Sequence, residues 1–451
     1  MPEPRGRSAV KSCIVVHPAV RGPTPGSQRS AQARLAEAVG LARSIDLAVV
    51  HAEVVHIPAI RPSTLFGAGI VERYAELIKS WHSKDTSPIE VAIVEAALTP
   101  VQQRNLERAW NTKVVDRTGL ILEIFGERAR TAEGELQVEL AALTYQRSRL
   151  VRSWTHLERQ RGGFGFVGGP GESQIETDRR LIRERIARLK RELQHVRRTR
   201  DLHRRARRRV PYPIAALVGY TNAGKSTLFN RLTRADVAAR DQLFATLDPT
   251  MRALDLPSGR KAILSDTVGF ISDLPIELVE AFRATLEEVT EADLVVHVRD
   301  ASHPETEAQK QDVEAVLHSL GLATILETDS MIVVLNKIDL MSSEERQTLA
   351  NRVARSRGGA VVLSARTGEG SDDLLRLLDE RLAASMRVLD VSLSPGDGAA
   401  LAWLYRHGEV IERQVGDDEI RLRVRLSAPH AARFARRDEQ PLSSPAHAAR
   451  G

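Results

Sequence analysis

The sequence predicts an α/β protein of several domains, with a helical hairpin between two α/β regions. Apolar strand-like runs alternate with helical segments over residues 1–130 and again over 210–387, a pattern typical of mainly parallel sheets. A chain of 451 residues is also too long for one ordinary hydrophobic core. We therefore predict an N-terminal α/β domain (1–130), an antiparallel helical hairpin (131–209), a second α/β domain with a mainly parallel sheet (210–387), a small C-terminal α+β domain (388–436) and a disordered tail (437–451).

The composition excludes several classes of protein. Apolar residues make up 42% of the chain and charged residues 27%, as in soluble globular proteins. No apolar run approaches the roughly 20 residues that cross a bilayer, and the first residues lack the apolar core of a signal peptide. Cys13 is the only cysteine, which excludes an intrachain disulfide and a thiolate metal cluster. We therefore expect a cytoplasmic protein without integral membrane association, and we take a monomer as the default.

The N-terminal domain is predicted from two strands and the helix between them. Residues 13–16 and 47–51 are strand-like apolar runs, and residues 27–44 have a helical pattern. Residues 67–69, Gly-Ala-Gly, precede a further helix and are interpreted first as a strand-to-helix turn. The alternative is an anion site made by the exposed N–H groups of that turn.

The hairpin is predicted from apolar residues at helical spacing on both sides of a glycine-rich loop, residues 162–172. These residues are Leu136, Leu140, Leu143, Leu150, Trp154 and Leu157 before the loop, and Ile182, Ile186, Leu189, Leu193 and Val196 after it. The loop contains Gly163-x-Gly165-x-x-Gly168, the spacing of a dinucleotide-binding fingerprint. That fingerprint requires a strand before the glycines, and a helix precedes them here. We therefore interpret the loop as the tip of the hairpin.

The second hairpin helix is strongly basic. Residues 176–209 hold fifteen Lys or Arg and five Asp or Glu, so their net charge of +10 exceeds the +6 of the whole chain. Such a helix is either a solvated face with salt bridges or a contact for a nucleic-acid phosphate backbone.

The second α/β domain opens with a phosphate-binding loop. The strand-like run 214–218 leads into a P-loop of the spacing G-x-x-x-x-G-K-S, and a helix follows. Its backbone N–H groups would surround the β-phosphate, Lys225 would reach the β- and γ-phosphates, and the Ser226 hydroxyl would ligate Mg²⁺. The predicted nucleotide-binding residues here are Gly219, Tyr220, Thr221, Asn222, Ala223, Gly224, Lys225, Ser226 and Thr227.

Two further segments have the pattern of nucleotide switches. The first is Phe244, Ala245, Thr246, Leu247 and Asp248, and the second is Asp266, Thr267, Val268 and Gly269. By motif alignment we prefer Thr246 over Thr250 as a Mg²⁺ ligand. We expect Asp266 to hold Mg²⁺ through water, and the Gly269 N–H to contact the γ-phosphate.

The base is predicted to be guanine. Asn336, Lys337, Ile338 and Asp339 follow an apolar strand, and Ser364, Ala365 and Arg366 follow another. The Asp339 carboxylate can accept hydrogen bonds from guanine N1 and N2, a pair of donors that adenine lacks. The second segment would close over the base and offer N–H groups to guanine O6.

Phe270 departs from the pattern of Ras-like GTPases, which have a glutamine directly after the switch glycine. A phenyl ring cannot orient the attacking water, so we predict slow hydrolysis by the protein alone. Either another side chain or a bound partner takes that role. The predicted catalytic residues are Lys225, Thr246 and Gly269. Asn222 occupies the position of an asparagine in potassium-dependent GTPases, which suggests a K⁺ site.

The last predicted domain contains one clear strand. Apolar residues occupy every second position of residues 419–426, after a turn at 416–418.

Together these motifs resemble the HflX family of GTPases. The resemblance rests on Arg117-Thr-Gly-Leu-Ile-Leu, on loop 162–172 and on the sequences of residues 244–248 and 266–270, and it covers nearly the whole chain. It implies an α/β N-terminal domain, a helical hairpin, a P-loop GTPase domain and, in some members, a small C-terminal domain. We expect the slow GTP hydrolysis of this chain to be stimulated by the ribosome. Family members bind the large ribosomal subunit, and some use GTP to split stalled or stressed ribosomes.

The resemblance also implies RNA contacts at the hairpin tip. In that arrangement the N-terminal domain and hairpin lie against ribosomal RNA, with Arg161, Phe164 and Phe166 as candidate contacts. The alternative is a flexible turn whose phenylalanines cover the hairpin end. Some members are reported to use ATP at the N-terminal domain, although residues 67–72 contain no lysine.

Two other functions stay open from the sequence. One is an RNA-binding or ribosome-assembly module that uses GTP as an occupancy switch. The other is a tRNA-directed or membrane-peripheral GTPase.

Overall fold

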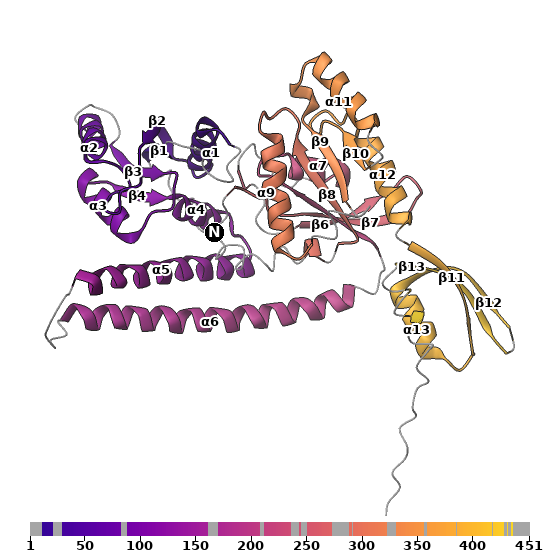
Figure 1. Cartoon of the computed structure of the whole chain (residues 1–451). Helices are drawn as coiled ribbons and strands as arrows, with labels where there is room; N and C mark the ends of the chain where they lie inside the picture. Colours follow the sequence, from indigo (N-terminus) through magenta and orange to yellow (C-terminus); the bar gives the residue numbers. More distant parts are fainter. Residues whose placement is uncertain are drawn as a thin grey trace, which may run out of the picture.

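The computed structural model describes residues 11–20, 29–82, 88–160, 170–207, 212–235, 243–244, 250–272, 288–290, 292–322, 331–355, 359–384, 386–416, 418–427, 431 and 434–435. Figure 1 shows an N-terminal α/β domain beside a second α/β domain, with a long helical hairpin along the first and a small sheet at the C-terminal side. The predicted α/β multidomain fold is confirmed.

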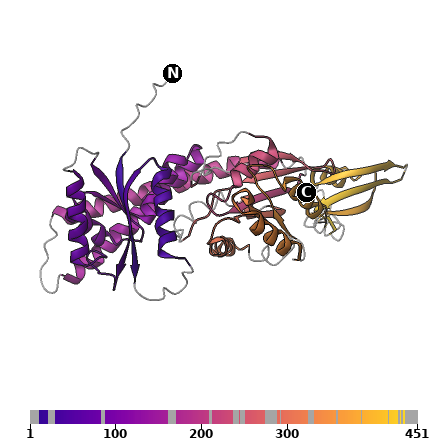
Figure 2. The ribbon, with the colours of Figure 1, turned by 90° about the horizontal axis from the view of Figure 1, so that it is seen from above.

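The N-terminal domain is a parallel four-stranded sheet in the order β2-β1-β3-β4. Its strands are β1 (Ser12–Val20), β2 (Ala48–Ile57), β3 (Ile89–Val94) and β4 (Lys113–Asp116). Its helices are α1 (Ala31–Ser44), α2 (Ala68–His82), α3 (Pro100–Trp110) and α4 (Arg117–Arg128). Figure 2 shows helices on both faces of this sheet. Consequently β1 is buried on both sides, as expected for a central parallel strand.

Local signals explain where these helices begin. The predicted helix 27–44 starts at Ala31, because the Ser30 hydroxyl accepts a hydrogen bond from the Ala33 N–H and caps the helix. Helix α3 starts after a capping box formed by Thr99 and Gln102. Helix α2 begins at Ala68, so Ala68 and Gly69 belong to its first turn, and the Gly67 carbonyl oxygen accepts from the Ile70 and Val71 N–H groups. The strand before it ends at Ile57, so these residues are a helix start and not the predicted strand-to-helix turn.

The hairpin consists of α5 (Ala132–Gln160) and α6 (Pro170–Arg207). Their seam is closed by the predicted apolar positions Ile186, Leu189 and Leu193, which are all buried. The Arg185 guanidinium forms an ion pair with Glu139 across the seam at 2.7 Å. The two helices lie side by side in Figure 1.

The second α/β domain has a six-stranded sheet in the order β10-β9-β8-β5-β7-β6. Its strands are β5 (Ile214–Gly219), β6 (Thr250–Asp255), β7 (Lys261–Asp266), β8 (Leu294–Asp300), β9 (Met331–Asn336) and β10 (Ala360–Val362), and only β6 is antiparallel to its neighbour. Its helices are α7 (Lys225–Thr233), α9 (Thr306–Ser319), the 3-10 helix Ile338–Leu340, α11 (Ser343–Arg355) and α12 (Ser371–Ala384). The parallel strands bring their carboxyl ends to one edge, where ligands bind in such sheets.

In its described residues, the C-terminal domain is an antiparallel sheet with helix α13 packed against it. Its elements are β11 (Met386–Leu393), α13 (Gly398–His407), β12 (Gly408–Val415) and β13 (Ile420–Ser427), with the sheet order β11-β13-β12. The alternating residues of β13 place Leu422, Val424 and Leu426 in the core, as the period of two predicts.

One hydrophobic core runs through both α/β domains. Leu35, Leu41 and Phe125 of the N-terminal domain share it with Phe244 and Phe270 of the second domain. The Phe125 and Phe244 rings meet edge to face, with centroids 4.7 Å apart. The two domains therefore pack against each other through residues next to the predicted switches. In the described part of the chain, no helix is long and apolar enough to span a membrane.

Candidate guanine nucleotide site

The P-loop lies between the end of β5 and the start of α7. Gly219 has φ +152, and a Cβ built on it would lie 2.1 Å from the Val298 carbonyl oxygen. Gly224 has φ +93, and its Cβ would lie 2.2 Å from the Asn336 side-chain nitrogen. Both positions require glycine, because another residue would strain the backbone and displace a neighbouring element.

Lys225 lies at the centre of this loop and is almost fully buried. Its Nζ donates hydrogen bonds to the carbonyl oxygens of Gly219 at 3.0 Å and Tyr220 at 2.9 Å. Burial lowers the pKa of Lys225 to about 8, although the negative charge of Asp266 acts in the opposite direction. The amine is thus held by backbone dipoles where a phosphate would approach the loop.

Two oxygen donors meet beside the P-loop at the start of α7. The Ser226 hydroxyl donates to the Asp266 carboxylate at 2.7 Å, and Asp266 is fully buried at the end of β7. Mg²⁺ binds hard oxygen ligands and keeps several waters, so a hydroxyl and a carboxylate at this spacing fit it. Thr250 is the first residue of β6 and pairs with Asp266 across the sheet. Thr246 lies outside the described residues.

The predicted base-binding residues converge on the P-loop. Asn336 donates to the Ala223 carbonyl oxygen at 2.8 Å and accepts from the Ala365 N–H at 2.9 Å. It therefore ties the P-loop to the loop after β10. The Arg231 side chain, from α7, donates to the Ala365 carbonyl oxygen at 3.2 Å and supports the same loop.

Asp339 faces this loop with both carboxylate oxygens engaged. The Ser364 hydroxyl donates to one oxygen at 2.6 Å, and the Arg366 guanidinium lies 2.6 Å from the other. Burial acts to raise the pKa of Asp339, but the Ser364 hydrogen bond and the Arg366 charge hold it below its usual value. Lys337 has φ +67, and its Nζ forms an ion pair with Asp300 at 2.8 Å. Asp339 is thus an anionic acceptor of the kind that guanine recognition needs.

The segment after β7 crosses directly over the P-loop. A Cβ on Gly269 would lie 2.9 Å from the Thr221 Cα and 3.0 Å from the Lys225 Nζ. The Thr221 N–H donates to the Phe270 carbonyl oxygen at 2.7 Å, and the Phe270 N–H donates to the Gly219 carbonyl oxygen at 3.1 Å. The Phe270 side chain is 1% exposed and packs in the core shared by the two α/β domains. The ring therefore points into the interdomain core.

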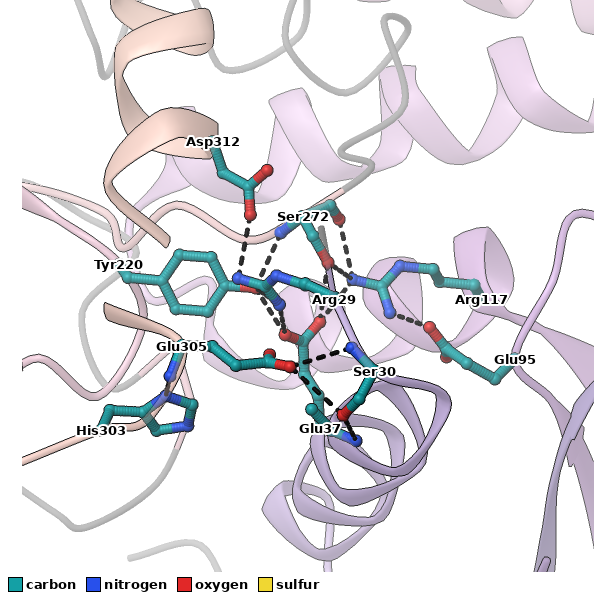
Figure 3. A network of polar contacts seen from close by, with 11 residues as sticks. Arg29, Ser30, Glu37, Glu95, Arg117, Tyr220, Ser272, His303, Glu305 and Asp312 are labelled. Atoms are coloured by element: carbon teal, nitrogen blue, oxygen red, sulfur yellow. Dashed lines mark hydrogen bonds and ion pairs between the residues drawn. The ribbon is translucent and has the colours of Figure 1, made fainter. Parts of the chain in front are cut away.

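The sequence did not indicate several polar residues that reach this site from the N-terminal domain. Figure 3 shows Arg29, Glu37 and Arg117 beside Tyr220 of the P-loop and Ser272, which follows the second switch. The only signal was the segment beginning at Arg117, which was used for the family resemblance and not for the site.

Some predicted residues lie outside the described parts of the chain. They are Arg161, Phe164 and Phe166 at the hairpin tip and Ala245, Thr246, Leu247 and Asp248 in the first switch. Among the residues that the structure describes, no group of three or more His, Cys, Asp or Glu side chains could hold a metal ion.

Family models match almost the whole chain in four consecutive parts. Residues 32–126 match the model described as GTP-binding GTPase N-terminal, and residues 128–207 match GTP-binding GTPase Middle Region. Residues 214–337 match 50S ribosome-binding GTPase, and residues 348–444 match HflX C-terminal domain.

Curated relatives are similar over most of their length. The GTPase HflX of Magnetococcus marinus is 52% identical over 396 residues, which cover 88% of this chain and 88% of the relative. The GTPase HflX of Escherichia coli is 43% identical and covers 82% of this chain and 84% of the relative. A solved GTP-binding protein from Sulfolobus solfataricus in complex with GDP is 22% identical, with a TM-score of 0.43 over 82% of this chain and 98% of that protein.

Proposed function

Because this chain belongs to the HflX family of GTPases, we propose that it hydrolyses GTP on the large ribosomal subunit and uses its nucleotide state to split or rescue ribosomes under stress. The observation that carries the nucleotide half of the proposal is the convergence of Lys225, the Ser226 and Asp266 pair, and Asn336 at one edge of the sheet.

The proposed reaction is in-line attack of water on the γ-phosphate. Lys225 would leave the carbonyl oxygens of Gly219 and Tyr220 and bind the β- and γ-phosphates, where its charge stabilises the transition state. Ser226 would hold Mg²⁺ directly and Asp266 through water, with Thr246 as the further ligand. The ion would supply positive charge that stabilises the charge developing on the phosphate oxygens. The Gly269 N–H would donate a hydrogen bond to the γ-phosphate.

We assign guanine selection to Asp339 and the loop containing Ser364, Ala365 and Arg366. The Arg366 guanidinium lies on one of the Asp339 oxygens that guanine would use, and it would share that carboxylate with the base or release it when the base binds. Asn336 would keep the P-loop and the base loop in register during that exchange.

The Phe270 ring cannot orient the attacking water. We therefore assign the group that orients this water to the ribosome. Support for that partner comes from the match of residues 214–337 to a model described as 50S ribosome-binding GTPase. Support also comes from exposed cations on α6, among them Arg183, Lys190 and Arg191. These side chains fit contact with a phosphate backbone.

The test is GTP hydrolysis alone and with purified large subunits at two salt concentrations. We expect strong, salt-sensitive stimulation that Lys225→Ala abolishes. Reversing two charges on α6, with Arg183→Glu and Lys190→Glu, should reduce stimulation and leave the basal rate unchanged. Reversing two exposed charges on α11, with Arg352→Glu and Arg355→Glu, is the matched control. Stimulation that is absent at both salts would refute the ribosomal part of the proposal.

The same system separates the occupancy-switch alternative from the leading proposal. If Lys225→Ala abolishes turnover but ribosomes still separate into subunits, GTP serves as an occupancy signal for an RNA-binding module. Two finer assignments are tested alongside. Equal rates in NaCl and KCl would remove the K⁺ site at Asn222, which has φ +59. Absence of ATP binding by the N-terminal domain would remove an ATP site at Gly67 and Gly69.

A further inference from the structure

A buried group of polar residues joins the N-terminal domain to both phosphate-facing segments of the second domain (Figure 3). We name it the interdomain polar cluster; its members are Arg29, Glu37, Glu95, Arg117, Tyr220 and Ser272. Arg29 precedes α1, Glu37 lies within α1, Glu95 follows β3 and Arg117 begins α4. Tyr220 belongs to the P-loop, and Ser272 lies three positions after Gly269.

The Tyr220 hydroxyl is the centre of this cluster. It donates to the Glu37 carboxylate and accepts from the Ser272 N–H at 2.9 Å and from the Arg29 guanidinium at 2.9 Å. One donor and two acceptor positions are all that a hydroxyl offers, so its hydrogen-bonding capacity is filled. The P-loop side chain therefore contacts the other domain and the second switch at the same atom.

Arg117 holds the other side of Ser272. Its guanidinium donates to the Ser272 carbonyl oxygen at 2.7 Å and to the Ser272 hydroxyl at 2.9 Å. It also forms ion pairs with Glu37 at 2.6 Å and with Glu95. Ser272 is thus bound through its N–H, its carbonyl oxygen and its hydroxyl, which fixes the end of the second switch against the first domain.

The charges in this cluster are buried and depend on one another. Burial acts to raise the pKa of Glu37, but Arg117, Tyr220 and Arg29 together hold it below its usual value. The Glu37 side chain is 10% exposed and that of Arg117 is 7% exposed. Removing one partner of a buried pair leaves an uncompensated charge, so the cluster resists partial rearrangement.

On the nucleotide side, the cluster is connected to the residues that would meet the γ-phosphate. The Tyr220 carbonyl oxygen accepts a hydrogen bond from Lys225, and the Phe270 backbone is hydrogen-bonded to the P-loop on both sides. Phe270 lies between Gly269 and Ser272 in the chain. A shift of Gly269 toward a γ-phosphate would therefore act first on the Phe270 hydrogen bonds with the P-loop and, through this short segment, on the bonds of Ser272 to Tyr220 and Arg117.

On the other side, the cluster is connected to the hairpin through the residue before Arg117. Asp116 accepts hydrogen bonds from the Tyr145 hydroxyl at 2.7 Å and from Arg149 at 3.3 Å, both on α5. It also caps α4 by accepting from the Gly119 N–H at 2.8 Å. Consecutive residues, Asp116 and Arg117, thus hold the hairpin and the second switch.

We propose that Glu37 and Arg117 are positioning residues of the GTPase, which couple the GTP or GDP state at Tyr220 and Ser272 to the placement of α5 through Asp116. The coupling is reciprocal: displacing α5 changes the preference of the site for GTP over GDP by the same factor. This inference requires nucleotide binding and does not require the ribosome.

Three tyrosines provide a matched series for the test. Each donates its hydroxyl to a carboxylate: Tyr220 to Glu37, Tyr145 to Asp116 and Tyr74 to Glu53. Tyr74 is fully buried in the core on the other face of the N-terminal sheet, and its contact with Glu53 stays within that domain. Replacing each by phenylalanine removes one hydroxyl and keeps the ring.

The measurement is hydrogen exchange of the full chain with GDP and with a non-hydrolysable GTP analogue, without ribosomes. In the wild type we expect a nucleotide-dependent difference both at residues 266–272 and at residues 140–149 of α5. Tyr220→Phe should reduce the α5 difference at least threefold and change the ratio of the two nucleotide dissociation constants. Tyr145→Phe should reduce the α5 difference but keep the one at 266–272. Tyr74→Phe should keep both.

Ser272→Ala is a second, milder variant, because it removes only the hydroxyl contacts with Arg117 and Glu37. It should lower the α5 difference in the same direction, which guards against misfolding of Tyr220→Phe. The proposal is overturned if the wild type shows no nucleotide-dependent difference at α5, or if Tyr220→Phe and Ser272→Ala both retain the full difference. Because no ribosome is present, loss of ribosomal stimulation cannot be mistaken for either result.

Discussion

Replacing Phe270 by glutamine tests why this GTPase lacks the usual water-orienting side chain. The substitution would restore the residue of Ras-like enzymes at this position. In this structure, however, the side chain is 1% exposed and lies in the interdomain core beside Phe244 and Val268. A glutamine on the same backbone would enter that core and would not reach the γ-phosphate. We therefore expect Phe270→Gln to leave single-turnover hydrolysis no faster.

The expected loss of stability in Phe270→Gln has two parts, because a buried phenyl ring is removed and a buried amide is introduced. Burying a phenylalanine side chain stabilises by about 1.5–3 kcal/mol, and leaving a buried amide without partners costs about 1–3 kcal/mol. Together these give a loss of about 2.5–6 kcal/mol, a large share of the stability of a typical domain. Phe270→Leu keeps the apolar contact and should lose far less, so it serves as the matched control.

The assay is urea unfolding of the three proteins together with single-turnover hydrolysis with and without large subunits. The midpoint should fall strongly for Phe270→Gln and slightly for Phe270→Leu. Phe270→Leu should keep ribosomal stimulation, since the wild-type ring supplies no hydrogen bond to water. A Phe270→Gln protein with an unchanged midpoint and faster basal hydrolysis would refute this account of position 270.

Three further predictions concern the base, the metal and acid stability. Asp339→Asn should weaken GTP binding by roughly 10- to 100-fold, because charge-assisted hydrogen bonds contribute about 1.5–3 kcal/mol. The variant should also favour xanthosine triphosphate. Unchanged affinities for both nucleotides in a fluorescence titration would contradict this prediction. Ser226→Ala should raise the Mg²⁺ concentration for half-maximal hydrolysis by roughly tenfold or more, whereas an identical Mg²⁺ titration would exclude Ser226 as a ligand. Burial lowers the pKa of His297 to about 3, below its unfolded value of 6.5. As the pH falls, the unfolded chain therefore binds the proton before the folded protein does. The free energy of unfolding should fall as the pH falls from 6.5 toward 3. The loss of stability between pH 7 and pH 5 should be about 2 kcal/mol, measured by urea unfolding at both pH values. His297→Leu should remove this pH dependence, whereas a substitution of the exposed His318 should not.

The phosphate and base motifs could be predicted because their chemistry is local. Gly219 and Gly224 are required by the backbone of one short loop, and Asn336 and Asp339 follow one strand. Such patterns are contiguous in sequence, so spacing alone places their residues. The hairpin was predictable for a related reason, since Ile186, Leu189 and Leu193 repeat with the period of a helix and form its buried seam.

The interdomain polar cluster could not be predicted in that way. Arg29, Glu37 and Arg117 are charged residues with no periodic spacing, and each is more often found on a surface. They become buried only because two domains pack against each other, and no pattern within a single sequence segment indicates that contact. The sequence likewise indicated that Phe270 cannot bind water, but not that its ring packs in a core shared with Phe125 and Leu41 of the other domain.

Both switch segments contact the N-terminal domain through residues that the structure describes, Phe244 in the first and Ser272 next to the second. The first is held by apolar contact, because Phe244 packs edge to face on Phe125. The second is held by polar contact, because Ser272 is bound by Arg117 and Tyr220. A nucleotide-driven movement of either segment would therefore disturb contacts at the interface between the two domains. Removing the N-terminal domain would expose Phe244 and Phe270 and leave Tyr220 without its buried partner, so such a truncation changes stability and catalysis together. Single hydroxyl deletions separate these effects, since they break the coupling contacts while both domains keep their shared core.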